Sequence, residues 1–190
     1  MSDNKKVAVL VSGGGTNLQA LIDKEKAGQL PGLEIVKVIA SRADAFALER
    51  AAKAGIATAV ALEQEQVLEE LQASGADLVV LAGYMRVLSP DIIQEYRNRI
   101  INIHPSLIPK YCGKGFYGKR VHKAVIEGGE KESGATVHYV DEGVDTGEII
   151  LQRKVPVMPD DTPDTLAARV LEVEHEILAE GLIKAAAQIS

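Results

Sequence analysis

Two polar side chains interrupt an apolar stretch in the middle of the chain, in the segment RIINIHPSLIP from Arg99 to Pro109. Side chains alternate across a strand, so Asn102 and His104 share one face, and Pro105 ends the strand directly after them. A buried amide and imidazole are costly unless they are hydrogen-bonded, so backbone groups could simply satisfy both. Alternatively, an amide N–H and an imidazolium can together donate to the oxygen charge that develops when a carbonyl becomes tetrahedral. The pair therefore predicts either a structural polar contact or an oxyanion site.

A carboxylate beside His104 would raise the pKa of the imidazole, keep it charged and provide a route for protons. The segment DEGVDTG supplies three candidates, Asp141, Glu142 and Asp145. Their spacing does not match that of a calcium-binding EF-hand loop. The chemistry of the residues alone leaves the choice among the three open.

A glycine-rich turn, SGGGTN, runs from Ser12 to Asn17 after the first apolar segment. Thr16 and Gln19 have capping-box spacing, which predicts that a helix starts there. Glycines let a backbone approach a ligand closely, and free N–H groups at a helix N-terminus attract anions. The turn lacks the third glycine of a dinucleotide site and the lysine of a P-loop. The sequence predicts a site for one phosphate group, or else a tight turn that binds nothing.

Composition narrows the classes of function. The 190 residues are 46% hydrophobic and 25% charged, which fits one domain, and the net charge of −6 argues against binding to nucleic acid or anionic membranes. The single cysteine excludes an internal disulfide. No apolar run approaches the roughly 18 residues of a membrane span or forms a signal peptide, so we expect a cytoplasmic protein. Five cations between Lys110 and Lys123 suit small anionic substrates or, equally, a solvated face.

Segments of strand length alternate with segments of helical period over the first half of the chain. The strand segments are Val7–Val11, Glu34–Ala40, Ile56–Val60, Asp77–Gly83 and Arg99–Ile103. The helical segments are Leu18–Lys26, Phe46–Lys53, Val67–Gln72 and Ile92–Tyr96. This alternation predicts an α/β fold with a doubly wound, mostly parallel sheet whose strands are buried on both faces. Ligands bind such sheets beyond the carboxyl ends of the strands, where Asn102 and His104 lie.

After Ser133 the pattern changes. The segments GATVHYV and EIILQRKVPV read as two alternating strands joined by DEGVDTG, which predicts an antiparallel pair at the end of the sheet. A late helix is expected from about Thr162, with Pro163 in its first turn.

Five segments in order along the chain resemble the phosphoribosylglycinamide formyltransferase family. They are SGGGTNLQALID, LAGYMRVLSP, INIHPSLIPKY, GATVHYVDEGVDTGEIILQ and ARVLEVEH, and the resemblance extends from Val7 to about Leu182. It implies a Rossmann-like formyltransferase fold in a single domain over residues 1–190, with a phosphate-binding N-terminal half and a folate-binding, catalytic C-terminal half. It also implies transfer of a formyl group from 10-formyltetrahydrofolate to the amine of glycinamide ribonucleotide, in purine biosynthesis and without a metal.

The resemblance also implies roles for individual residues. The catalytic positions match Asn102, His104 and Asp145. The positions that contact glycinamide ribonucleotide match Gly14, Gly15, Thr16, Asn17, Pro109 and Glu174. The positions that contact the folate match Met85, Arg86, Val87, Leu88, Asn102, Val140, Asp141, Glu142, Gly143, Val144 and Asp145. The implied mechanism is direct attack by the amine, with Asn102 and protonated His104 holding the oxyanion and Asp145 assisting proton transfer.

The chain departs from the commoner family pattern at YCGKGFYGKRVH, and it has Gln64 and Gln66 where some members carry a folate-side arginine. Related readings are a formyltetrahydrofolate deformylase, which normally adds an N-terminal domain, and a methionyl-tRNA formyltransferase, which adds a C-terminal one. A non-catalytic phosphate-binding α/β module would explain SGGGTN and leave His104 idle. The partners that we expect are small molecules, with no nucleic acid and no membrane, and the chain is expected to act as a monomer or homodimer.

Overall fold

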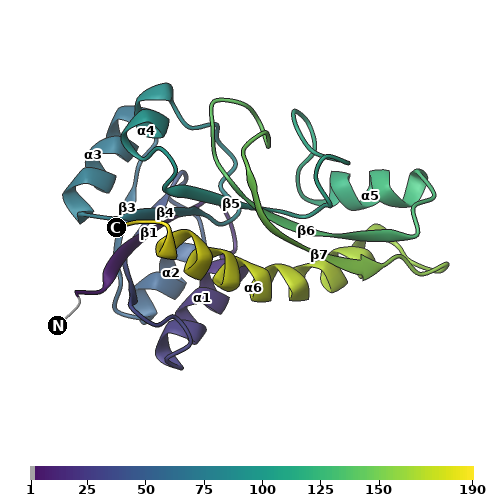
Figure 1. The fold of residues 1–190 in the computed structure, drawn as a ribbon, viewed down its shortest axis with the longest axis horizontal. Coiled ribbons are helices and arrows are strands. Elements are labelled where there is room, and N and C mark those ends of the chain that lie inside the picture. The colour runs from purple at the N-terminus through teal and green to yellow at the C-terminus, as the bar shows by residue number, and fades with distance from the viewer. Residues whose placement is uncertain (1–2) are drawn as a thin grey trace.

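The computed structural model describes residues 3–190, and its strands form one seven-stranded sheet in the order β3-β2-β1-β4-β5-β6-β7 (Figure 1). The strands are β1 Lys5–Val11, β2 Leu33–Ala40, β3 Ala57–Val60, β4 Leu78–Leu81, β5 Ile100–His104, β6 Glu132–Tyr139 and β7 Ile149–Pro156. The first five strands are parallel, whereas β6 runs antiparallel to β5 and β7 antiparallel to β6. The doubly wound, mostly parallel sheet with an antiparallel end is confirmed.

Helices cover both faces of this sheet. They are α1 Thr16–Lys26, α2 Ala47–Lys53, α3 Gln64–Ser74, α4 Pro90–Glu95, α5 Lys119–Glu127 and α6 Pro163–Ala187. Figure 1 shows α3 and α4 on one side and α1, α2 and α6 on the other. Accordingly, Val9 of β1 packs in one cluster with Leu18 of α1, while its neighbour Leu10 packs with Val67 of α3. None of the helices between residues 3 and 190 combines the length and apolar character needed to cross a membrane.

The late helix begins where the sequence places it. Thr162 is the N-cap of α6, its hydroxyl accepts a hydrogen bond from the N–H of Thr165 at 3.2 Å, and Pro163 is the first helical residue. Proline fits this position because its missing N–H would have no partner inside the helix. Leu166, Val170 and Ile177 are fully buried against the sheet, so α6 covers much of one face.

Two elements differ from the expectations. β3 is an edge strand and three of its four residues are exposed, so it is not buried on both faces as the other parallel strands are. α5 was not predicted with bounds of its own, because its sequence KRVHKAVIE is rich in cations and flanked by glycines. Val121 and Val125, four residues apart, nevertheless give α5 a buried stripe in the cluster shared with α6.

A glycine, and not the predicted capping box, sets the start of α1. Gly15 is the N-cap residue and has a left-handed backbone with φ of 77°, and no side chain caps the helix. The side-chain amide of Gln19 donates instead to Asp23 at 2.9 Å. A Cβ atom at Gly15 would lie only 2.6 Å from the Cβ of Ala47 in α2. The turn therefore needs glycine here both for its backbone conformation and for the close approach of α2.

We expect Gly15→Ala to lower the free energy of unfolding by about 3 kcal/mol, because it adds left-handed strain and a steric overlap with α2. Gly13→Ala is the matched control, since no atom lies within 4 Å of a Cβ built there. That variant should change the free energy by less than about 1 kcal/mol. Urea unfolding followed by circular dichroism measures both, and equal destabilisation by the two variants would contradict this account of the turn.

Candidate active site

A cavity of about 630 Å³ lies where the strand order reverses between β1 and β4. The chain moves outward from β1 through β2 to β3 and then returns to β4 and β5 on the other side of β1. The carboxyl ends of β1 and β4 therefore form the topological switch point of the sheet. Asn17 follows β1, Met85 follows β4, and Asn102 and His104 end β5, and all four line the cavity. Its volume lies within the roughly 300–1,000 Å³ that is usual for ligand pockets.

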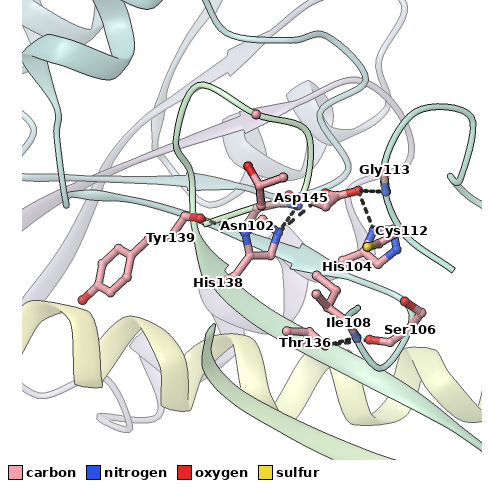
Figure 2. A network of polar contacts seen from close by, with 12 residues as sticks. Asn102, His104, Ser106, Ile108, Cys112, Gly113, Thr136, His138, Tyr139 and Asp145 are labelled. Atoms are coloured by element: carbon pink, nitrogen blue, oxygen red, sulfur yellow. Dashed lines mark hydrogen bonds and ion pairs between the residues drawn. The ribbon is translucent and has the colours of Figure 1, made fainter. Parts of the chain in front are cut away.

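Asp145, from the loop between β6 and β7, lies between two imidazole rings (Figure 2). Its Oδ2 is 3.6 Å from Nδ1 of His104, and its Oδ1 is 3.6 Å from Nε2 of His138. The backbone N–H of Gly113 donates to Oδ2 at 2.9 Å. Burial alone would raise the pKa of Asp145, but the contacts with His138, Gly113 and His104 outweigh it, and the pKa lies below its ordinary value. The carboxylate is therefore charged at neutral pH.

The three carboxylates of the DEGVDTG segment have different surroundings. Oδ1 of Asp141 accepts hydrogen bonds from the N–H of Gly143 at 3.0 Å and the hydroxyl of Thr146 at 2.5 Å, so this side chain closes the turn. Glu142 is exposed and pairs with Arg97. Of the three, Asp145 is the one that reaches His104, which narrows the choice that residue chemistry left open.

His104 is buried and its Nε2 lies 2.9 Å from the carbonyl oxygen of Tyr111. Because a carbonyl only accepts, this nitrogen carries a hydrogen. Burial lowers the pKa of His104, and the charge of His138 lowers it further, whereas the Tyr111 carbonyl and Asp145 act in the opposite direction but are outweighed. Burial therefore opposes the charged imidazole that the sequence analysis expects, and the carboxylate of Asp145 offsets only part of that cost.

In its neutral form, His104 has a lone pair at Nδ1, since its hydrogen is then on Nε2. The 3.6 Å that separates Nδ1 from Asp145 exceeds the roughly 2.7–3.2 Å of a hydrogen bond. Nδ1 can therefore accept a proton from a group in the cavity. The resulting imidazolium would lie between two acceptors, the carboxylate of Asp145 and the carbonyl of Tyr111.

His138 is a buried site residue that the sequence analysis did not single out. It lies opposite Asn102 in the β5–β6 register, with its Nε2 3.1 Å from Nδ2 of Asn102. Its Nδ1 lies 2.8 Å from the carbonyl oxygen of Tyr139 and must carry a hydrogen, which leaves Nε2 facing the Asn102 amide and the Asp145 carboxylate. This contact fixes which end of the Asn102 amide faces the site. A histidine inside the apolar segment GATVHYV was the available signal.

Asn17 of α1 and Glu174 of α6 meet at another wall of the cavity. Nδ2 of Asn17 donates to Oε1 of Glu174 at 3.4 Å, and Oδ1 of Asn17 is buried with no hydrogen-bond partner among residues 3–190. Burial raises the pKa of Glu174 to about 7. The resemblance assigns both residues to one substrate, and the fold brings them together from the two ends of the chain.

The raised pKa of Glu174 makes stability depend on pH. Between its ordinary value of 4.5 and about 7, the folded protein binds more protons at this group than the unfolded chain does. The contribution of Glu174 to the free energy of unfolding is therefore greatest below pH 4.5. It falls by about 3 kcal/mol as pH rises towards and through 7. Glu174→Gln should remove this dependence. Urea unfolding of both proteins at several pH values measures it, and a constant difference between them from pH 4.5 to 8 would contradict the assignment.

Most of the residues implied to contact folate line the same cavity. They are Met85, Arg86, Val87, Leu88, Asn102, Val140, Asp141, Gly143, Val144 and Asp145. Three of them are large apolar side chains with high exposed fractions, 57% for Met85, 69% for Val87 and 43% for Val144. Exposed apolar side chains that gather at a cavity mark a surface for an apolar ligand face.

Other implied contact residues lie outside the lining of this cavity. Gly14, Gly15 and Thr16 form the turn just before Asn17, Pro109 lines a second cavity, and Glu142 points to Arg97 at the surface. The amide oxygen of Gln66 accepts the N–H of Glu63 at 3.2 Å, which caps α3, and that of Gln64 accepts the N–H of Ser89 at 2.8 Å. Gln64 thus supports the loop after β4, and Gln66 supports the segment between β3 and α3.

The cluster of cations after Pro109 is largely paired. Lys119 contacts Asp164 at 2.8 Å and Lys123 contacts Glu127 at 3.8 Å, in addition to a pair between Lys110 and Glu130. These ions are exposed, so the solvated-face interpretation explains most of them. Lys114 and Lys119 also line the main cavity.

Comparisons with known proteins find relatives by sequence and by structure. Residues 5–182 match the family model described as formyl transferase. The phosphoribosylglycinamide formyltransferase of Haemophilus influenzae is 44% identical over 91% of this chain and 83% of its own length. The trifunctional purine biosynthetic protein adenosine-3 of Drosophila melanogaster is 46% identical over 90% of this chain, which spans only 13% of that protein. The crystal structure of glycinamide ribonucleotide transformylase 1 from Symbiobacterium toebii has a TM-score of 0.91 and 40% identity, covering 98% of this chain and 90% of that one.

Proposed function

The chain belongs to the formyl transferase family, and from this premise we propose that it transfers the formyl group of 10-formyltetrahydrofolate to the amine of glycinamide ribonucleotide, a step of purine biosynthesis. The observation that carries the proposal is the arrangement of Asn102, His104 and Asp145 at one cavity of the switch point. These side chains supply an amide donor, an imidazole and a carboxylate, which are the groups that transfer of an acyl carbon between two nitrogens requires.

The walls of the cavity fit a folate. Met85, Val87 and Val144 offer an apolar surface for a flat ring system. The loop between β6 and β7 adds Val140, Asp141, Gly143 and Asp145 to the lining of the same cavity. The bound formyl folate would supply the one-carbon unit as an amide on its nitrogen.

The turn before α1, next to the part of the cavity lined by Asn17 and Glu174, suits the phosphate of a ribonucleotide. Gly13 to Thr16 form a turn at the N-terminus of α1, where backbone N–H groups and the helix dipole favour an anion. Asn17 and Glu174 lie next to this turn and line the cavity, where they can hydrogen-bond sugar hydroxyls. The two ends come from different parts of the chain, so we further propose that residues 1–190 act as a single domain.

In the proposed mechanism the amine nitrogen forms a bond to the formyl carbon. The free N–H of the Asn102 amide donates to the formyl oxygen as its negative charge develops. Nδ1 of His104 takes the proton that the attacking amine loses, and Asp145 stabilises the imidazolium. His104 then returns the proton to the folate nitrogen as the bond from that nitrogen to the formyl carbon breaks. The protons balance without a covalent intermediate on the enzyme.

Separate binding of the two substrates tests this proposal against a non-catalytic phosphate-binding module. Tetrahydrofolate and glycinamide ribonucleotide, added one at a time, should each raise the thermal unfolding midpoint. At about 100 times the dissociation constant, each should add about 2.7 kcal/mol of stability. Val87→Asp is the matched variant, because Val87 is 69% exposed at the apolar wall. It should lose the response to folate and keep the response to the ribonucleotide. A wild-type response to the phosphate compound alone would contradict the proposal.

A further inference from the structure

Two residues with left-handed backbones flank the catalytic imidazole. Among residues 3–190, three residues other than glycine have positive φ, namely Asn98, Tyr111 at 52° and Asp145 at 57°. Tyr111 presents its carbonyl to Nε2 of His104, and Asp145 presents its carboxylate to Nδ1. Aspartate tolerates this conformation better than most residues, but at Tyr111 it is unfavourable and persists only where the surroundings enforce it. Whatever holds Tyr111 in this conformation therefore also places its carbonyl at His104.

The side chain of Tyr111 is held at the far end of α5. Its hydroxyl donates to Oε1 of Glu130 at 3.1 Å, and the same carboxylate pairs with Nζ of Lys110 at 3.1 Å. Gly128 makes room for the phenol, because a Cβ at Gly128 would lie 2.3 Å from the Tyr111 hydroxyl oxygen. The ring of Phe116 packs edge-on against the phenol, with centroids 6.1 Å apart. The phenol is thus fixed at its tip and along one edge.

The short turn from Lys110 to Gly113 contacts both members of the catalytic pair. Besides the Tyr111 carbonyl on His104, the N–H of Gly113 donates to Oδ2 of Asp145 at 2.9 Å. At its other end the turn is tied by the buried hydroxyl of Ser106, which donates to the carbonyl of Lys110 at 2.6 Å. Movement of this turn would displace the acceptor at one ring nitrogen of His104 and the donor to its carboxylate together.

We propose that Tyr111 and Glu130 are positioning residues for His104, acting through the backbone carbonyl of Tyr111. The inference rests on the proposed function and deepens it. The bond from the phenol to Glu130 holds the left-handed turn, the turn places the carbonyl at Nε2, and the carbonyl keeps the hydrogen on Nε2. The lone pair of Nδ1 then faces Asp145 and the cavity, where the proton of the amine arrives. Tyr111 ends INIHPSLIPKY, which matches the family pattern, and begins YCGKGFYG, in which the chain departs from it.

Loss of the hydrogen bond between the Tyr111 hydroxyl and Glu130 would release the turn and allow the imidazole of His104 to change tautomer. With the hydrogen on Nδ1, His104 would donate to Asp145 and have no lone pair available for the amine. The groups outside the turn would stay in place: Asp145 from the β6–β7 loop, His138 from β6 and His122 from α5. The thiol of Cys112 belongs to the turn and would move with it. The Tyr111 carbonyl is among the groups that raise the pKa of His104, so loss of this contact lowers that pKa further.

The test compares Tyr111→Phe and Glu130→Ala with two other variants of the full chain. Glu130→Gln retains an oxygen that accepts from the phenol and should restore activity to within about twofold of wild type. Lys154→Met breaks a similar exposed ion pair, with Glu132, and serves as the control. The readouts are kcat, KM for each substrate, and the ¹H–¹⁵N ring spectrum of His104, one of four histidines in the chain, recorded against pH.

We expect Tyr111→Phe and Glu130→Ala to lower kcat about tenfold with KM within about twofold, since small displacements of a reacting group are costly. The ring spectrum should change from one tautomer, with hydrogen on Nε2, to a mixture, and the titration of His104 should move to lower pH. Lys154→Met should match wild type in all readouts.

Wild-type kcat together with a wild-type His104 spectrum in Tyr111→Phe would overturn the proposal. If Tyr111→Phe does not fold, Glu130→Ala carries the same test, because its side chain lies at the surface end of the network. If wild type itself transfers no formyl group, the ring spectrum still decides the question. A changed tautomer in the variants then supports the positioning role and leaves the proposed function as the part that failed, and an unchanged one overturns the positioning role.

Discussion

Replacing His104 with alanine should lower kcat by about 100-fold or more, the scale of losing a group that acts only in the transition state. The substitution removes the lone pair at Nδ1 that accepts the proton of the amine, and later the imidazolium that returns it. KM for both substrates should change much less, because the apolar wall at Val87 and the turn before Asn17 remain. Steady-state kinetics with each substrate varied in turn measure the effect.

A matched control separates this loss from general damage to the fold. His175 is also a partly buried histidine, on α6, but it does not line the cavity. His175→Gln should therefore keep kcat within about twofold of wild type. Thermal unfolding of both variants verifies that each is folded at the assay temperature. A folded His104→Ala protein with nearly normal kcat would remove His104 from the proposed chemistry.

Asp145→Asn should lower kcat by about 1,000-fold, within the range found for groups that take part in proton transfer. The amide would have no charge to stabilise the imidazolium of His104. It would also place an NH₂ group or a weaker acceptor beside two imidazole rings that now share a carboxylate. The hydrogen bond from the Gly113 N–H can persist to the amide oxygen, so the loop should retain its shape.

The matched control for Asp145 is Glu148→Gln, which neutralises an exposed carboxylate at the other end of the same loop. Its kcat should equal that of wild type. If both substitutions lower kcat alike, the effect belongs to the net charge of the loop and not to the contact of Asp145 with His104. Isotope-edited titration of His104 gives an independent readout, since loss of a neighbouring negative charge should move its pKa further down.

Much of the fold could be predicted because buried parallel strands are continuous apolar runs. Val7–Val11 and Glu34–Ala40 show this pattern plainly, and both strands are observed within one or two residues of the expected bounds. The start of α6 could be predicted because Thr162 and Pro163 are a local signal. α5 lacked such a signal, since Lys119 at its start is an unfavourable charge for the positive end of the helix dipole. Its stability comes from packing on α6, which is a property of the fold.

Some features of the site could likewise be predicted from local sequence, and others depend on the fold. The sequence placed Asn102 and His104 on one face of a strand end, because alternation and Pro105 are local features. The choice of Asp145 over Asp141 depended on the path of a loop, and the sequence could not supply it without the resemblance. The low pKa of His104 follows from burial by distant elements. The groups that hold the pair in place, the Tyr111 carbonyl and the Gly113 N–H, are backbone atoms that no residue type reveals.

The central claim is that this site passes a formyl group from folate to an amine and not to water. The most direct measurement follows the fate of the carbon. The wild-type protein is incubated with 10-formyltetrahydrofolate labelled with ¹³C in the formyl group, with and without glycinamide ribonucleotide, and the products are followed by ¹³C nuclear magnetic resonance. The account predicts that the label appears as a formamide on the ribonucleotide, one for each folate released, and only when the amine is present. Labelled formate released at the same rate with and without the amine would contradict it.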